Sequence, residues 1–236
     1  MNVKTIILQS PSEDTLIDTM YIAAKTCYSE NTIREISENE ISKEDKLKLI
    51  KKVMDSGHHS IAEHINFTIG IDGISRSCSH QLVRHRLCTY SQQSQRYINM
   101  KDKNGFDFVI PEKLKTKTEM AHRYIDMMHT IKDFYDELIN EGLLPEDARY
   151  ILPNATCTNI TMSTNLRNLM HVMGLRLCSR AQWEIRAVYK SIANQLIEKY
   201  PFLKDYLVPQ CEINGYCHEL TCCGRKPKLD NKTKNK

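Results

Sequence analysis

The sequence predicts an α+β fold in a single domain, on the strength of two patterns and the length. Residues 65–72 alternate apolar and polar side chains, which is the period of a half-buried strand. Residues 116–141 repeat apolar side chains at the three- and four-residue spacing of an amphipathic helix. A chain of 236 residues is long enough to bury one sizeable core, and 41% hydrophobic and 26% charged residues are ordinary for a globular protein.

The other elements follow from turn and capping signals along the chain. Residues 3–8 form a short apolar run that predicts a strand, and Ser10 to Glu13 has the form of a capping box with Pro11 at the first helical position. A second helix begins at about Ser42 and ends at Gly57. The remaining expected elements are a helix at 75–83, strands at 106–110 and 155–164, a short helix at 145–149, a helix capped by Asn165 and a last helix ending near Tyr200.

The helix at 116–141 is expected to bury a stripe of methionine and aromatic side chains. Such a stripe marks a core or a subunit contact far more often than a cofactor site, because these side chains fill irregular apolar space. The residues expected to face inward are Met120, Tyr124, Met127, Met128, Ile131, Phe134, Tyr135 and Leu138.

The net charge of +4 is concentrated at the C-terminus. Residues 225–236 hold six Lys or Arg residues against Asp230, a net charge of +5, which leaves −1 for the preceding chain. The body is therefore not basic, which argues against a general nucleic-acid surface. The chain shows no signal peptide and no apolar run approaching the ~20 residues of a membrane span, so we expect a cytoplasmic protein.

The cysteines favour a reduced protein. Nine cysteines in a chain of this length do not suggest a disulfide framework. Cys211, Cys217, Cys222 and Cys223 lie close together in a predicted C-terminal tail, 209–236, which follows the domain at 1–208. These four thiols could ligate zinc, but they lack the paired C-x-x-C spacing of persuasive zinc sites, so we expect reduced thiols and no metal.

The strongest functional signal is the polar stretch from Gln81 to Tyr97. It contains three arginines, and no Asp or Glu occurs between Arg76 and Lys101. Residues two apart do not share a helix face, so Arg84 and Arg86 need a loop or an extended backbone if they are to converge. Convergent arginines favour a phosphate or carboxylate ligand. The eight glycines include neither G-x-G-x-x-G nor a P-loop, so side chains must bind such a ligand.

This stretch resembles the signature of the flavin-dependent thymidylate synthases. The matching residues are Arg84-His85-Arg86, the hydroxyl of Thr89 where the family has Ser, then Ser94 and Arg96. Downstream, Leu175, Arg176 and the run Ala181–Glu184 resemble the family's second arginine region, with His171 in place of an expected Asn and Arg180 in place of an expected His.

The segment from Gly57 to His64 adds to the resemblance. It places three histidines, a serine and a carboxylate within eight residues, so metal binding must be weighed. His59 and His64 are five apart, and the His-Glu-x-x-His spacing is absent. His58, Ser60 and Glu63 instead stand at matching positions of the family's Gly-His segment, which contributes to a flavin pocket.

The resemblance implies a set of ligands and the residues that bind them. It implies FAD, with NADPH and methylenetetrahydrofolate as co-substrates, dUMP as substrate, and a homotetramer whose subunits have a small, mostly antiparallel sheet covered by helices. The FAD-binding residues would be His58, Ser60, Glu63, Arg84, His85, Arg86, Gln92, Asn165, Arg167 and His171. The dUMP-binding residues would be Gln81, Arg84, Gln92, Ser94, Gln95, Arg96, Arg149 and Arg176, with Arg96 and Arg149 as phosphate anchors.

Two of these residues would take part in the reaction, and two other function classes compete. Arg176 would stabilise the ionised uracil ring, and Ser94 would donate a hydrogen bond to the nucleotide rather than attack it, because no activating base is evident. A cysteine-nucleophile methylase using Cys88 beside the two arginines is one alternative. An RNA-binding protein using the arginines and the basic tail is the other, although the tyrosines are not grouped as a stacking platform.

Overall fold

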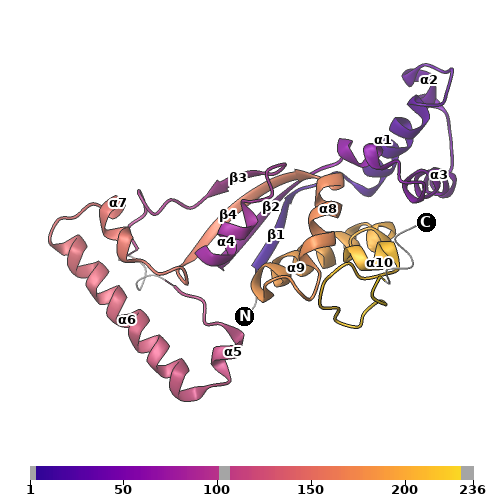
Figure 1. Ribbon diagram of the computed structural model, residues 1–236. Coiled ribbons are helices and arrows are strands. Elements are labelled where there is room, and N and C mark those ends of the chain that lie inside the picture. The colour runs from indigo at the N-terminus through magenta and orange to yellow at the C-terminus, as the bar shows by residue number, and fades with distance from the viewer. Residues whose placement is uncertain (1–3, 101–106, 230–236) are drawn as a thin grey trace. The chain divides into compact units, whose positions relative to one another are not determined.

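The computed structural model describes residues 4–100 and 107–229, and within them the chain is α+β (Figure 1). One antiparallel sheet has the strand order β1-β2-β4-β3. Its strands are β1 (Lys4–Gln9), β2 (Asn66–Ser75), β3 (Thr89–Gln92) and β4 (Cys157–Asn165). The α-helices are α1 (Glu13–Thr26), α2 (Ile33–Glu38), α3 (Lys43–Asp55), α4 (Arg76–Leu82), α5 (Glu112–Lys115), α6 (Thr118–Asn140), α7 (Pro145–Ala148), α8 (Leu166–Arg176), α9 (Trp183–Lys199) and α10 (Gln210–Asn214). Short 3₁₀ helices lie at His59–His64 (η1), Arg149–Ile151 (η2) and Pro201–Asp205 (η3).

The chain forms two compact units, and all four strands contribute residues to both. We call them the α6 unit, which comprises residues 1–5, 70–86 and 90–162, and the α8 unit, which comprises residues 6–69, 87–89 and 163–236. The expected alternation in β2 is confirmed, since Ile65, Phe67, Ile69 and Ile71 are all buried. The predicted boundary between a domain at 1–208 and a tail at 209–236 remains a prediction.

The α8 unit is built on helices that pack through buried apolar faces. Helix α1 contacts α2, α3 and η1, while α8 contacts η1, α9 and α10. Leu16 and Met20 of α1 are fully buried, and so are Ile50 and Met54 of α3. Figure 1 shows α8, α9 and α10 grouped together near the C-terminal end of the chain.

Capping side chains set where these helices begin. The expected cap of α3 is confirmed, because the Ser42 hydroxyl accepts a hydrogen bond from the backbone N–H of Asp45 at 3.1 Å. The expected capping box at Ser10 is wrong: the N-cap is Ser12, whose Oγ accepts from Thr15 N, so Pro11 precedes the helix. A capping box occurs instead at Thr32 and Glu35, where it begins α2.

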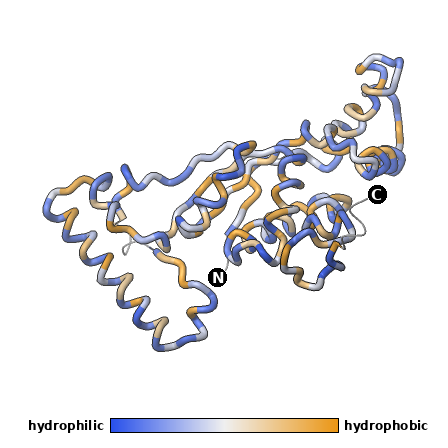
Figure 2. The backbone as a smooth tube through the Cα atoms, viewed as in Figure 1, coloured by the Kyte–Doolittle hydropathy of each residue, from blue (hydrophilic) through white to orange (hydrophobic). Residues whose placement is uncertain are grey.

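The α6 unit places one long helix beside several short elements. Figure 2 shows hydrophobic and hydrophilic residues interspersed along α6. Tyr135 and Met128 are buried as expected, but the prediction that the whole stripe faces inward is wrong. Met120, Met127 and Phe134 are 49%, 56% and 45% exposed, because they lie on a different face of the helix.

One further expectation in the α6 unit needs correction. The predicted strand at 106–110 is reduced to an isolated antiparallel bridge between Phe108 and Thr156 within the described part, while residue 106 lies outside it. The long helix expected at 116–141 is confirmed as α6, and the short helix α5 precedes it. By contrast, α4 begins as expected, with the Ser75 hydroxyl capping Cys78 N.

The C-terminal segment packs on α8 at a glycine. A Cβ atom added to Gly174 would lie 3.0 Å from Oε1 of Gln210, so the missing side chain permits the close approach of α10. The Gln210 amide donates to Asn214 Oδ1 at 2.9 Å, and Asn214 Nδ2 lies 2.8 Å from His218 Nε2. Among the described residues, no helix is long and apolar enough to cross a membrane.

Candidate functional site

A pocket of about 520 Å³ lies at the beginning of α8, inside the α8 unit. It is lined by Glu63 of η1, by Leu87, and by four residues at the N-terminal end of α8: Asn165, Arg167, Asn168 and His171. Backbone N–H groups at a helix N-terminus and an arginine side chain both favour an anionic ligand. The pocket thus brings together four of the predicted cofactor-binding residues, namely Glu63, Asn165, Arg167 and His171.

Two asparagines hold the beginning of α8 in place. The Asn165 side chain caps the helix as expected, with Oδ1 accepting from Asn168 N at 2.8 Å. The buried Asn168 amide donates to Thr164 Oγ1 at 2.8 Å and to Cys88 Sγ at 3.1 Å. The second bond ties the segment at 87–89 to the same helix end, so Asn168 fixes two walls of the pocket at once.

Two other predicted cofactor residues lie on η1 outside this lining. His58 precedes the 3₁₀ helix and Ser60 lies within it, and both are exposed. The Ile65 carbonyl accepts from Leu166 N at 2.7 Å, which joins the end of η1 to the beginning of α8.

In the α6 unit, the three residues Arg84, His85 and Arg86 form a turn after α4. This confirms that their backbone is not helical. The Tyr90 hydroxyl lies 2.7 Å from the Leu82 carbonyl and 3.1 Å from the His85 carbonyl, and it donates to both. Tyr90, which the sequence analysis did not single out, therefore holds the turn from strand β3 while both arginine side chains remain exposed.

Glutamine side chains brace the same region. Gln92 Nε2 donates to Ser79 Oγ at 2.9 Å and to Thr158 Oγ1 at 3.3 Å, so β3 is joined to α4 and β4. Gln81 Nε2 donates to the Ser77 carbonyl at 3.3 Å. The amide nitrogens of both predicted ligand-binding glutamines thus make contacts within the protein.

Glu146 positions the two arginines that were expected to bind phosphate. Its Oε2 accepts from Arg96 Nη2 at 3.0 Å and from Arg96 Nε at 3.2 Å, and its carbonyl accepts from Arg149 Nε at 3.0 Å. The hydrogen bond to Glu146 raises the pKa of Arg96. The ion pair is half-exposed, at 50% for Arg96 and 41% for Glu146, so its own contribution to stability is small.

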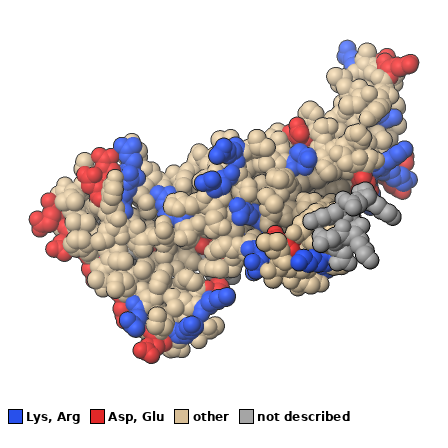
Figure 3. Space-filling model, in the orientation of Figure 1, with Lys and Arg blue, Asp and Glu red and all other residues tan. Residues whose placement is uncertain are grey.

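Arg76 is a further candidate that the sequence analysis used only to mark the edge of the acid-free stretch. Burial lowers the pKa of Arg76, and the charge of nearby Arg149 lowers it further. Two arginines that repel one another in this way are stabilised by an anion. Figure 3 shows Lys and Arg side chains over the region of α4 and β3, whereas acidic side chains gather near α6 and α7.

The remaining predicted residues are placed as follows. Ser94 Oγ accepts from Arg96 N at 3.1 Å and so shapes the turn after β3, in which Gln95 is half-buried. Arg176 is the last residue of α8 and is half-buried. Within residues 4–100 and 107–229, no group of three or more His, Cys, Asp or Glu side chains is arranged to hold a metal ion.

Comparison with known proteins decides the family. The family model of the thymidylate synthase complementing proteins matches residues 12–202. The chain belongs to this family. The match includes the turn at Arg84, the pocket at α8 and Arg149 in one continuous stretch.

Relatives of this family extend over most of the chain. The flavin-dependent thymidylate synthase of Pyrococcus furiosus is 43% identical over 197 residues, covering 81% of this chain and 79% of its own. The protein of the same name from Clostridium tetani is 35% identical over 247 residues, covering 97% and 96%. A crystal structure of the UMP/dUMP methylase PolB from Streptomyces cacaoi, bound with 5-Br dUMP, shares the fold with a TM-score of 0.73 at 20% identity, covering 85% of this chain and 92% of that one.

Proposed function

We propose that the protein is a flavin-dependent thymidylate synthase that converts dUMP to dTMP. The observation that carries the proposal is the polar pocket at the beginning of α8, with Arg167 and His171 in its wall, in a chain of this family. Methylenetetrahydrofolate is the one-carbon donor and NADPH the reductant in this proposal. The reaction takes place in the cytoplasm.

The residues of the pocket fit FAD. Arg167 and the N-terminal end of α8 bind its phosphates, while Glu63 and Asn165 offer oxygen acceptors to its hydroxyl and amino groups. His58, Ser60, Arg84, His85, Arg86, Gln92 and His171 complete the proposed set. Bound FAD supplies the redox chemistry of the methylation.

The arginines of the α6 unit fit the phosphate of dUMP. Arg96 and Arg149 are held near one another by Glu146, and Arg76 adds a third positive charge. Because the pair between Arg96 and Glu146 is exposed, a phosphate dianion can compete with the carboxylate for the guanidinium. Gln81, Gln92, Ser94 and Gln95 orient the nucleoside.

Arg176 and Ser94 have different parts in the proposed reaction. Arg176 stabilises negative charge on the uracil ring as carbon 5 accepts the methylene group. Ser94 orients the nucleotide, in keeping with an Oγ atom that already accepts a backbone hydrogen bond. Cys88, the nucleophile of the alternative mechanism, ties the segment at 87–89 to the Asn168 amide of α8, and this structural role is the one proposed for it.

The homotetramer is part of the same proposal. Met120, Met127 and Phe134 recur at seven-residue spacing on α6 and are about half exposed. A heptad spacing keeps side chains on one face of a helix, where another helix can cover them. A second copy of the chain is the proposed partner, and light scattering on the purified protein measures the state directly.

The experiment that tests the activity combines an assay with genetic rescue. Purified protein is expected to be yellow and to convert dUMP to dTMP when FAD, NADPH and methylenetetrahydrofolate are supplied. A cell without thymidylate synthase is expected to grow without thymidine when it carries the gene. Flavin-loaded, folded protein that fails in both tests would exclude the proposal.

A further inference from the structure

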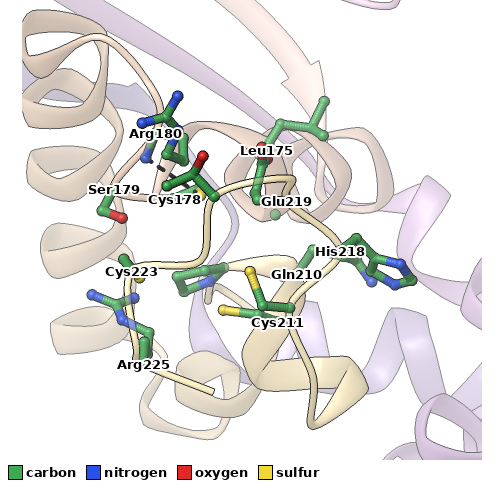
Figure 4. Close-up of a pocket in the computed structure, with 14 residues that line it drawn as sticks. Leu175, Cys178, Ser179, Arg180, Gln210, Cys211, His218, Glu219, Cys223 and Arg225 are labelled. Carbon is green, nitrogen blue, oxygen red and sulfur yellow. Dashed lines mark hydrogen bonds between the residues drawn. The ribbon is translucent and has the colours of Figure 1, made fainter. Parts of the chain in front are cut away.

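Five of the protein's nine cysteines surround one pocket in the C-terminal part of the α8 unit. Cys178 follows α8, Cys211 lies in α10, and Cys217, Cys222 and Cys223 lie in the loop that follows. The pocket has a volume of about 280 Å³, and four of the five thiols line it, all except Cys222. Figure 4 shows Cys178, Cys211 and Cys223 around this space with Arg180 and Arg225.

The backbone closes the loop so that Cys217 is fixed at one side of it. Cys217 N donates to the Pro227 carbonyl at 2.8 Å, and Leu229 N donates to the Cys217 carbonyl at 3.1 Å. These bonds form a parallel bridge between Cys217 and Lys228. The Cys217 side chain is buried, with only 5% of the residue exposed.

Cys222 lies inside the same closed loop, beside Cys217. Gly224 N donates to Cys222 Sγ at 3.3 Å, and this thiol donates to the Lys226 carbonyl at 3.2 Å. Lys226 and Pro227 are consecutive, and their carbonyls accept from Cys222 Sγ and from Cys217 N, so the two cysteines lie beside the same short segment. A positive φ of 85° at Gly224 makes the turn that brings its N–H to the sulfur.

The two thiols differ in access. Cys222 is half-exposed and its sulfur accepts a hydrogen bond from the Gly224 N–H group, whereas Cys217 is buried. This is the arrangement of an attacking thiol with a resolving thiol beside it.

We propose that Cys222 and Cys217 form a reversible disulfide by exchange with a low-molecular-weight disulfide. The Cys222 thiolate attacks one sulfur of that disulfide, whose S–S bond breaks and releases one thiol. Cys217 then gives up its proton and attacks Cys222 Sγ, which releases the second thiol and forms the internal bond. The two protein thiols lose two electrons, and the small disulfide gains them. The proposal goes beyond the thymidylate activity and does not depend on it.

The experiment uses the full chain and oxidised glutathione as the probe. After exposure, remaining thiols are alkylated and the peptides are mapped by mass spectrometry. The wild type is expected to contain the bond between Cys217 and Cys222 and to retain no glutathione at either residue, and dithiothreitol is expected to reverse it. Cys217→Ser is expected to trap glutathione on Cys222, and Cys222→Ser to leave Cys217 reduced.

Two matched controls separate this pair from other thiols. Cys27→Ser removes an exposed cysteine at the end of α1, and Cys223→Ser removes the exposed neighbour of Cys222. Both variants are expected to form the bond as the wild type does. If Cys217→Ser does not fold, the wild type and Cys222→Ser still decide the matter. A bond through Cys211 or Cys223, glutathione retained on wild-type Cys222, no reaction, or bound zinc that is lost with Cys217 would each overturn the proposal.

Discussion

The pocket at α8 and the arginine cluster of the α6 unit, which comprises Arg76, Arg96 and Arg149, are both polar, but their residues are held in place by different means. In the pocket, hydrogen bonds fix the walls: the buried Asn168 bonds to Thr164 and to Cys88, and the half-buried Asn165 caps the helix. In the cluster, Arg96 is held by an exposed carboxylate, and Arg149 by a backbone carbonyl of the same residue.

This difference indicates different energetics of binding. A pocket fixed by buried hydrogen bonds is preorganised, so a ligand loses little free energy in ordering it. The arginine cluster instead carries mutually repelling charges, so an anionic ligand supplies part of what holds it together. We therefore expect substitutions at the pocket to change both folding stability and FAD binding, and substitutions in the cluster to change mainly dUMP binding.

The largest loss of activity is expected when Arg176 is substituted. This residue lies on α8 but is proposed to act on the nucleotide. Arg176→Ala removes a charge aimed at the developing anion, which typically costs about 3 kcal/mol, or roughly a hundredfold in kcat. The measurement is kcat at saturating dUMP, so that weaker binding is not mistaken for slower chemistry. Arg34→Ala, on the exposed surface of α2, is the control. Normal turnover of Arg176→Ala would show that Arg176 does not stabilise the developing anion.

The next-largest effect is expected on dUMP binding when Arg149 is substituted. This substitution tests whether the arginine cluster binds dUMP. Arg149→Ala loses charge-assisted hydrogen bonds of about 1.5–3 kcal/mol, which corresponds to roughly ten- to hundredfold weaker binding. We expect KM for dUMP to rise by this factor while the melting temperature and the FAD content stay close to wild type. If Arg149→Ala instead lost FAD, Arg149 would contribute to FAD binding, and the proposed division between an FAD pocket and a dUMP-binding cluster would be wrong.

Asn165 tests the claim that the pocket couples stability to cofactor binding. Asn165→Ala removes a helix cap, at a cost of about 1 kcal/mol in the free energy of unfolding. Ser42→Ala removes the cap of α3 and is the matched control. Both variants are expected to melt earlier by similar amounts, measured without ligand, but only Asn165→Ala should bind FAD more weakly in a fluorescence titration. Equal FAD affinity in the two variants would contradict the proposed role.

Ser94 is expected to show the smallest effect. Ser94→Ala loses about one neutral hydrogen bond, or roughly 0.5–1.5 kcal/mol, so turnover at saturating dUMP should stay within a factor of about ten. The turn hydrogen bond to Arg96 N is lost as well, and a small rise in KM is expected from it. A folded, flavin-bound Ser94→Ala protein without activity would point to covalent catalysis by serine.

Sequence patterns correctly predicted several elements that depend on residues close together in the sequence. The alternation in β2, the caps at Ser42 and Asn165 and the non-helical turn at Arg84 are all confirmed. The cap of α1 was placed wrongly because two serines flank Pro11 and both fit a start signal. The strand expected at 106–110 fails, within its described residues, because an apolar run does not by itself supply a pairing partner.

The sequence analysis missed the residues that support the candidate site, while the ligand-binding residues that it named remain predictions. Tyr90, Asn168, Glu146 and Arg76 reach their partners from other elements, and no spacing in the sequence reveals such contacts. The exposure of Met127 was missed for a related reason, since helical spacing defines a face but does not say what covers it.

The close approach of α10 to Gly174 links two positions that are 36 apart in the sequence. A side chain at 174 would require the end of the Gln210 side chain to shift, and this shift would disturb the hydrogen bond from Gln210 to Asn214, which lies beside His218. A shorter side chain at 210 would leave more room for a side chain at 174. The residues at 174 and 210 should therefore vary together among related sequences, as a record of how α10 packs on α8.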